Sequence, residues 1–292
     1  MTTLVAGGPR VVALGGGHGL AATLRAARKY AGEITAIVSV ADDGGSSGRL
    51  RETMGAAPPG DLRKCLAALA DPSSVLAAAL DHRFQAGELA GHALGNLLIA
   101  GLAEASGDLL SAIAEVGHLV GAVGRVLPAT LDGVVLKAVA RDCEVDGQVA
   151  VASTRNIARI FLEPRDPQPP QLAVDAIQRA DQVIIGPGSL YTSVLAAVVV
   201  PGLKEALHKC GAQRVYVCNL RAQAPEAAGY DVADHVAALE AHGVEVDAVL
   251  CDSSGISLGK MSKRCVDIFL AKENGLAHDS GKLAVALRDL LN

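Results

Sequence analysis

The sequence predicts an α/β protein of three layers, in which helices cover both faces of a mostly parallel sheet. Short apolar runs alternate with stretches of helical periodicity along much of the chain, as they do in a doubly wound sheet. A glycine-rich turn separates the first apolar run from the first helical stretch, which is how a Rossmann-like βαβ unit begins. Half of the residues are apolar but only 2% are aromatic, so small aliphatic side chains must fill the interior.

The first elements follow directly from this alternation. Residues 10–14 are apolar and end in glycines, residues 20–30 have helical spacing, and residues 34–40 are apolar again. A strand, a helix and a second strand in this order predict one βαβ unit at the amino end.

Helices are expected to dominate between about residues 60 and 120. Helical periodicity covers residues 62–69, 75–80 and 94–119, and Asp61 stands where it can cap the first of these helices. We therefore expect a helical insertion beside the sheet.

The alternation resumes after a small β excursion. Short β-branched segments at residues 134–139, 149–152 and 157–162 predict antiparallel strands, and four prolines between residues 164 and 170 indicate a surface connection. The remaining helices are expected at residues 172–179, 204–209, 232–241 and 282–291, and the remaining strands at residues 183–185, 215–218 and 248–251. We expect one domain over residues 1–292.

Charge and composition argue against several classes of partner. The net charge is −5 and there is no basic run, so nothing favours nucleic acid. No apolar stretch approaches the roughly 20 residues that span a bilayer, and no secretory signal opens the sequence. The six cysteines include no C-x-x-C pair and have mostly apolar neighbours, which indicates buried thiols in a reducing compartment. We therefore expect a cytoplasmic protein without a nucleic acid or membrane partner.

The most informative motif is a Gly-Pro-Gly-Ser loop directly after the apolar residues 183–185. Glycines, hydroxyl side chains and backbone N–H groups at the carboxyl end of a buried strand make a site suited to phosphate. The residues expected to contact such a ligand are Gly186, Pro187, Gly188, Ser189, Tyr191, Thr192 and Ser193.

A second glycine-rich loop follows residues 10–14. It matches the dinucleotide fingerprint only in part, because Leu20 stands at the third position, and it is not a Walker A loop. A tight turn is the alternative, but several glycines at about 0.5–1 kcal/mol each favour close approach of the backbone to a ligand. Two anion sites together predict a diphosphate and hence a nucleotide. The expected contacts are Gly15, Gly16, Gly17, His18 and Gly19.

Two adjacent acids, Asp42 and Asp43, end the second apolar run and precede a Gly-Gly-Ser-Ser-Gly sequence. In a dinucleotide fold an acid at this place binds ribose hydroxyls, and paired carboxylates also hold Mg²⁺ through phosphate oxygens. A solvated Asp-Gly turn is the alternative. We expect ligand contact at Asp42, Asp43, Ser46 and Ser47, and ribose and Mg²⁺ both remain open.

Weaker candidates complete the predicted site. Arg63 lies in the first turn of an expected helix, where a cation opposes the helix dipole by about 0.3–1 kcal/mol, so a bound anion would explain it. His92 and Asn96 share one helix face; His92 is more often structural than catalytic, and Asn96 needs a polar partner if it is buried. Asn219 follows the strand at residues 215–218 and so lies on the same sheet edge as the glycine loops. No catalytic residue is assigned.

These motifs together resemble the gluconeogenesis factors, the bacterial YvcK-like proteins (UPF0052), which are related to the CofD-like 2-phospho-L-lactate transferase of coenzyme F420 synthesis. The similarity covers about residues 10–235 and rests on six segments in the same order. They are residues 15–20 (GGGHGL), 40–50 (VADDGGSSGRL), 59–63 (PGDLR), 91–97 (GHALGNL), 126–130 (VLPAT) and 186–193 (GPGSLYTS).

The resemblance implies a cytoplasmic nucleotide-binding protein whose ligand is a UDP-sugar such as UDP-N-acetylglucosamine. It further implies a role in cell shape and cell-wall synthesis on gluconeogenic carbon, and leaves open an enzyme partner in envelope or carbon metabolism and a homo-oligomer. One departure concerns the sugar and base end of the site. Ala277 stands where the family has an arginine that helps to hold the UDP-sugar.

Two functions of different classes follow. The leading hypothesis is a regulator that binds a UDP-sugar and has no established reaction. The alternative is a Mg²⁺-dependent phosphotransferase, in which Asp42 and Asp43 hold the metal, Arg63 stabilises charge, and His92 or another group moves a proton. An NAD-dependent dehydrogenase would need a clean fingerprint, which the sequence lacks.

Overall fold

A seven-stranded sheet with the order β10-β9-β8-β7-β1-β2-β3 forms the centre of the protein, and each neighbouring pair of strands is parallel. The computed structural model describes residues 4–54, 57–141 and 143–291. The strands of this sheet are β1 (Arg10–Gly15), β2 (Glu33–Val38), β3 (Arg125–Pro128), β7 (Gln182–Ile185), β8 (Gln213–Val217), β9 (Ala248–Cys251) and β10 (Cys265–Asp267).

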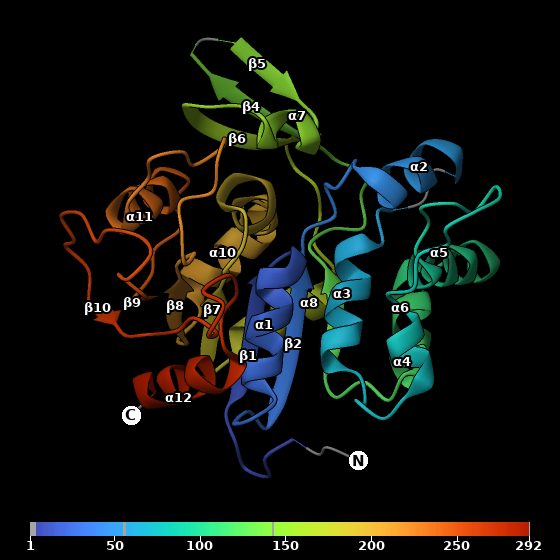
Figure 1. Ribbon diagram of the computed structural model, residues 1–292, viewed down its shortest axis with the longest axis horizontal. Coiled ribbons are helices and arrows are strands. Elements are labelled where there is room, and N and C mark those ends of the chain that lie inside the picture. Colours follow the sequence, from blue (N-terminus) through green and yellow to red (C-terminus); the bar gives the residue numbers. More distant parts are fainter. Residues whose placement is uncertain (1–3, 55–56, 142, 292) are drawn as a thin grey trace.

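Helices cover both faces of this sheet (Figure 1). On one face α1 (Gly17–Ala27) packs against α3 (Gly60–Leu69) and α12 (Ser280–Leu290). On the other face α8 (Gln171–Arg179) packs against α10 (Pro201–Lys209), and α9 (Ala196–Val198) contacts β1. The three-layer α/β/α architecture expected from the sequence is thus confirmed.

The position of β1 creates the crevice where ligands bind in such folds. β1 pairs with β2 on one side and with β7 on the other. The strands that follow β1 first, β2 and β3, extend the sheet on one side, and the later strands β7 to β10 extend it on the other side. The loops after β1 and β7 therefore leave neighbouring strands at the switch point, where open α/β sheets bind ligands. These are the two glycine loops that the sequence singled out.

The helical segment lies between β2 and β3 and contains α2 (Gly45–Met54), α3, α4 (Val75–Ala79), α5 (Leu94–Ser106) and α6 (Leu109–Leu119). Two details of the prediction were wrong. The helix expected over residues 94–119 is broken, because Gly107 has φ +67° and Asp108 caps α6. Asp61 does not cap α3, since it lies in the first turn and Pro59 holds the cap position.

A second, antiparallel sheet has the order β5-β4-β6 and lies above the main sheet in Figure 1. It consists of β4 (Val135–Ala140), β5 (Cys143–Asp146) and β6 (Ile157–Glu163). The strand expected at residues 149–152 was wrong, because these residues belong to helix α7 (Gln148–Ala152). The predictions also missed α2, β3, β5, β10, α9 and the π-helix over residues 190–195. Two further helices belong to the main domain. The π-helix η1 (Leu190–Leu195) follows β7, and α11 (Val232–Ala241) lies between β8 and β9 in the chain.

Within the described residues no single helix is long and apolar enough to cross a bilayer. One bent pair, residues 190–198 with residues 201–209 at 73°, meets the length and composition criteria alone.

Candidate functional site

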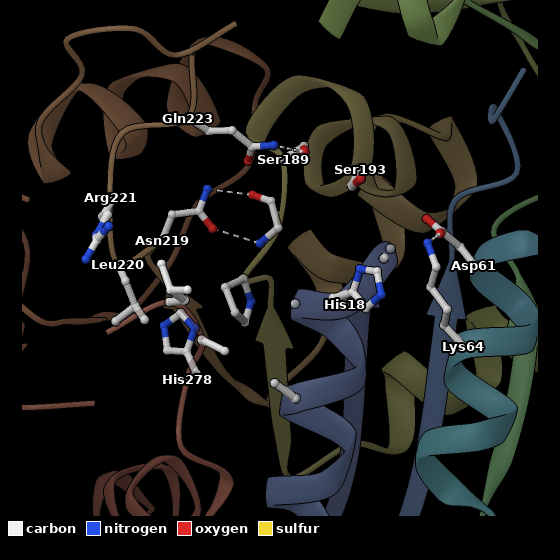
Figure 2. A pocket seen from close by; sticks show the side chains of 18 of the residues that line it. His18, Asp61, Lys64, Ser189, Ser193, Asn219, Leu220, Arg221, Gln223 and His278 are labelled. Carbon is white, nitrogen blue, oxygen red and sulfur yellow. Dashed lines mark hydrogen bonds and ion pairs between the residues drawn. The ribbon is translucent and has the colours of Figure 1, made fainter. Parts of the chain in front are cut away.

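A cavity of about 590 Å³ opens at the carboxyl ends of β1, β7 and β8 (Figure 2). Its wall combines both glycine loops with the loop after β8 and the segment before α12. The lining residues are Gly16, Gly17, His18, Gly19, Ala22, Asp42, Asp61, Lys64, Gln148, Pro187, Gly188, Ser189, Ser193, Asn219, Leu220, Arg221, Ala222, Gln223, Gly275, Leu276, Ala277 and His278. This volume falls in the range of small-molecule sites, roughly 300–1,000 Å³.

The two glycine loops pack directly against each other. A side chain at Gly19 would collide with the carbonyl oxygen of Pro187, and one at Gly188 would lie 3.4 Å from the carbonyl oxygen of Gly16. Gly188 also has φ +155°, which other residues rarely adopt. Close approach of two backbones therefore explains why glycine stands at these positions.

The start of α1 is open toward the cavity. Gly16 holds the cap position and has no side chain to offer, and the first helical hydrogen bond joins the Leu20 N–H to the Gly16 carbonyl at 3.4 Å. In the described part of the chain the N–H groups of Gly17, His18 and Gly19 have no protein acceptor. Unpaired amides at the positive end of a helix are suited to an anion.

The loop after β7 differs from this arrangement and from the expectation of free amides there. The Gly188 N–H donates to Asn219 Oδ1 at 3.0 Å (Figure 2). Glu226, from the loop after β8, lies against the start of η1 and binds the side chain of Thr192 there. The second loop thus meets the cavity mainly through the side chains of Ser189 and Ser193.

Glu226 is almost completely buried, at 2% exposure. Its Oε2 accepts from Thr192 Oγ1 at 3.0 Å, and its Oε1 has no hydrogen-bond partner among the described residues. Burial raises the pKa of the carboxyl to about 7. Thr192 therefore serves this carboxyl and not the cavity. Sequence analysis missed Glu226, because nothing local distinguishes it from a surface glutamate.

Tyr191 also lies away from the cavity. Its hydroxyl donates to the Ile157 carbonyl at 3.1 Å and is 2.8 Å from the hydroxyl of Tyr230. Beneath the loop, the carbonyl of Gly186 accepts from Thr23 Oγ1 at 2.8 Å. Gly15 and Gly186 support the loops from below and do not line the cavity.

The two adjacent acids have separate roles. Asp42 lines the cavity, accepts from the Gly44 N–H at 3.0 Å, and has its pKa raised by burial. Asp43 points toward α7 instead, where its two oxygens accept from the N–H groups of Gln148 and Val149, both at 2.9 Å. Both oxygens of Asp43 thus cap a helix, and of the two acids only Asp42 lines the cavity. The pairing of Asp42 with Asp43 around one Mg²⁺ stays a prediction.

The acid that faces the cavity together with Asp42 is Asp61. Its Oδ1 accepts from Lys64 Nζ at 2.9 Å, and both side chains line the cavity beside His18 (Figure 2). Burial, followed by the nearby charge of Lys64, lowers the pKa of His18. Asp61 and Lys64 were missed as site residues because a helix-cap role was sufficient to explain Asp61.

Four predicted contacts form a separate polar cluster outside the cavity. Ser47 Oγ accepts from the Gly60 N–H at 3.1 Å, and Ser46 Oγ accepts from Asn96 Nδ2 at 3.0 Å. Arg63 is buried and pairs with Asp81. These side chains join α2, α3 and α5, so the polar partner expected for Asn96 exists but is the hydroxyl of Ser46.

The carboxyl-terminal wall was the part of the site that sequence analysis located least well. Arg221 and Gln223 line the cavity from the loop after β8, and Gln223 Nε2 donates to Ser189 Oγ at 2.6 Å. Residues 275–278 close the opposite side, where His278 Nε2 is 3.2 Å from the Cys218 carbonyl. Two signals in the sequence pointed to this wall: the position of residues 219–223 after a strand at the same sheet edge, and the family resemblance at Ala277.

Comparison with known proteins gives a consistent result. Residues 11–288 match the family described as "2-phospho-L-lactate transferase CofD". The "Putative gluconeogenesis factor" of Mycobacterium leprae is 44% identical, over 96% of this chain and 85% of that protein. The "Gluconeogenesis factor" of Bacillus subtilis is 39% identical, over 97% and 98% of the two chains.

A solved structure agrees with these relatives. The crystal structure of a UPF0052 family member from Bacillus halodurans superimposes with a TM-score of 0.91 at 36% identity, over 95% of this chain and 98% of that one. This chain therefore belongs to the family of the gluconeogenesis factors and CofD.

Proposed function

We propose that this protein is a regulator that binds a nucleoside diphosphate sugar of the UDP-N-acetylglucosamine class, and that it links carbon supply to cell shape and envelope growth through a partner enzyme. The observation that carries the proposal is the uncapped start of α1, which faces the cavity at the switch point of the sheet. The family's name supports the connection to carbon metabolism.

The diphosphate would lie over the amides of Gly17, His18 and Gly19, with the hydroxyls of Ser189 and Ser193 beside it. This places negative charge at the positive end of a helix. Lys64 and Arg221 add two cationic side chains to the same cavity. The sugar and base would then extend along residues 220–223 and 275–278, where Ala277 provides space but no charge.

The test is calorimetric titration with UDP-N-acetylglucosamine of the natural protein and of two variants of His18. His18 is exposed in the first turn of α1. In His18→Glu the new carboxylate stabilises the helix by about 0.3–1 kcal/mol but repels the diphosphate, so we expect affinity to fall about tenfold or more. His18→Gln is the matched neutral control and should stay within about threefold. Equal affinity of all three proteins would reject this placement.

A second candidate function is a Mg²⁺-dependent transferase of phosphorus-containing groups, and Asp42 with Asp61 at the cavity favours it. In the described residues no group of three or more His, Cys, Asp and Glu is placed to hold a metal. Two carboxylates nevertheless fit Mg²⁺, which commonly binds one or two of them together with phosphate oxygens and water. Bound there, the ion would neutralise phosphate charge, while Lys64 would have to release Asp61.

The second candidate is distinguished by turnover. A nucleoside diphosphate substrate incubated with the protein and Mg²⁺ should yield product, and Asp42→Asn should abolish it while leaving the protein folded. Asp43→Asn is the control, because Asp43 caps α7 and does not reach the cavity. Loss of turnover in Asp43→Asn but not in Asp42→Asn would overturn the assignment.

A further inference from the structure

Cys251 and Cys265 face each other on neighbouring strands at the edge of the main sheet. Their Sγ atoms are 3.2 Å apart, whereas a disulfide bond is about 2.05 Å long. Cys251 ends β9 and Cys265 begins β10, with Cys265 opposite Val249 and Cys251 opposite Asp267. The two thiols are therefore diagonal neighbours on one face of the pair, because residues two apart on a strand point to the same side.

The surroundings differ for the two sulfur atoms. Cys251 is fully buried and burial raises the pKa of its thiol, while Cys265 is only half-buried. Both are free thiols. This corrects the expectation that the cysteines are uniformly buried, since Cys143 is exposed as well. Cys265 is therefore the more accessible of the two thiols to a reagent in solution.

We propose that Cys251 and Cys265 are a reversible thiol–disulfide pair that takes a small disulfide, such as oxidised glutathione, as its oxidant. The Cys265 thiolate attacks one sulfur of the oxidant, forms a mixed disulfide and releases one small thiol. Cys251 then gives up its proton and attacks Cys265 Sγ, which releases the second small thiol. Two protein S–H bonds are replaced by one S–S bond, and the oxidant is reduced to two thiols.

The position of β10 makes this pair reversible and not a permanent structural bridge. β10 is a short edge strand of three residues, and the Sγ atoms must close from 3.2 Å to about 2.05 Å to form the bond. Cys265 is half-buried, and exposed disulfides are the more easily reduced ones. The pair therefore responds to the thiol–disulfide balance of its surroundings.

Hydrogen bonds connect this pair to the wall of the cavity. Asp252, the residue after Cys251, accepts from the Leu270 N–H at 2.8 Å and from the Ala271 N–H at 3.1 Å. Ala271 in turn forms an isolated β-bridge with His278, which lines the cavity. The Asp252 carboxylate and this β-bridge thus link the end of β9, where Cys251 lies, to residues 275–278.

The test uses the full chain in glutathione buffers of increasing oxidised fraction, followed by mass spectrometry of peptides under acid quench. We expect a peptide linked through Cys251 and Cys265 that returns to two thiols on adding reduced glutathione. In Cys251→Ala the reaction should stop with glutathione attached to Cys265, since the resolving thiol is absent. A second variant, Cys265→Ser, changes a half-buried position and should show neither product there.

Cys143 provides the internal control, because it is exposed and has no thiol partner among the described residues. Glutathione on Cys143 with Cys251 and Cys265 still reduced would overturn the proposal, and so would a link from Cys265 to Cys218. Hydrogen exchange then checks the connection to the cavity. Exchange in residues 270–278 should differ between the oxidised and reduced protein, and equal exchange would show that the pair does not act on this wall.

Discussion

Gly188 and Asn219 exchange two hydrogen bonds across the floor of the cavity. The Gly188 N–H donates to Asn219 Oδ1 at 3.0 Å, and Asn219 Nδ2 donates to the Gly188 carbonyl at 2.8 Å. An amide side chain matches a peptide group in this way, and among the described residues that line the cavity no other pair does so in both directions. The loop after β7 is therefore fixed by the residue that follows β8.

Replacing Asn219 tests how much this pair contributes to stability. Asn219→Ala leaves two backbone groups of Gly188 without partners, and we expect a loss of about 1–3 kcal/mol in the free energy of unfolding. Denaturant titration measures this change. Gln223→Ala is the control, because its exposed bond to Ser189 should contribute within about 0.5 kcal/mol. Equal losses in the two variants would contradict the role given to Asn219.

Two glycine substitutions test the contact between the loops. In Gly19→Ala the new methyl group collides with the Pro187 carbonyl oxygen, so we expect a loss of about 1–3 kcal/mol. Gly101→Ala in α5 meets nothing within 4 Å and should gain up to about 1 kcal/mol from helix propensity. The midpoint temperature of thermal unfolding should fall in Gly19→Ala and rise in Gly101→Ala. A shift in the same direction in both variants would argue against the collision.

Substitutions of Asp42 and of Asp43 should affect different properties, ligand affinity for Asp42 and stability for Asp43. Asp43→Ala removes the side chain that caps α7, and we expect about 0.5–2 kcal/mol of lost stability with unchanged ligand affinity. Asp42→Ala removes a cavity carboxylate and should alter nucleotide affinity with little loss of stability. Calorimetric titration and denaturant unfolding of both variants check the two halves of this prediction. A change of affinity in Asp43→Ala but not in Asp42→Ala would contradict the prediction, because Asp43 would then have to reach the ligand.

Glu226 should make stability fall as the pH rises. Its pKa in the native protein is about 7, above the value of about 4.3 in an unfolded chain, so the native state binds the proton more tightly. Its contribution is fully present below about pH 4, and is lost as the pH rises through 7, by at most roughly 4 kcal/mol. Glu226→Gln cannot ionise and should lose less stability over this window.

The measurement is the free energy of unfolding of both proteins between pH 5 and 8. Burial lowers the pKa of several histidines, including His235 and His278, which makes the free energy of unfolding rise with pH. This effect is the same in the natural protein and in the variant. The difference between the two curves therefore isolates Glu226. Parallel curves would mean that the buried carboxyl titrates at its ordinary pKa.

Much of the architecture could be predicted from the sequence, because its causes are local. Apolar runs ending in glycines at residues 10–14 and 183–185 match β1 and β7, and helical spacing located α1, α3 and α8. The errors came from short segments. Residues 149–152 are β-branched in part but form α7, because Asp43, more than 100 residues away, holds its first amides. β10 has three residues and depends on β9 for its place.

The sequence determined by itself that two glycine loops follow buried strands, and a glycine-rich turn needs no distant partner to form. Only the tertiary structure decided which of their amides remain available to a ligand. The Gly188 N–H is held by Asn219, 31 residues further along the chain, whereas the amides at the start of α1 stay open. The physical reason is that backbone donors are satisfied by whichever acceptor the fold brings near, and the chain order does not reveal that acceptor.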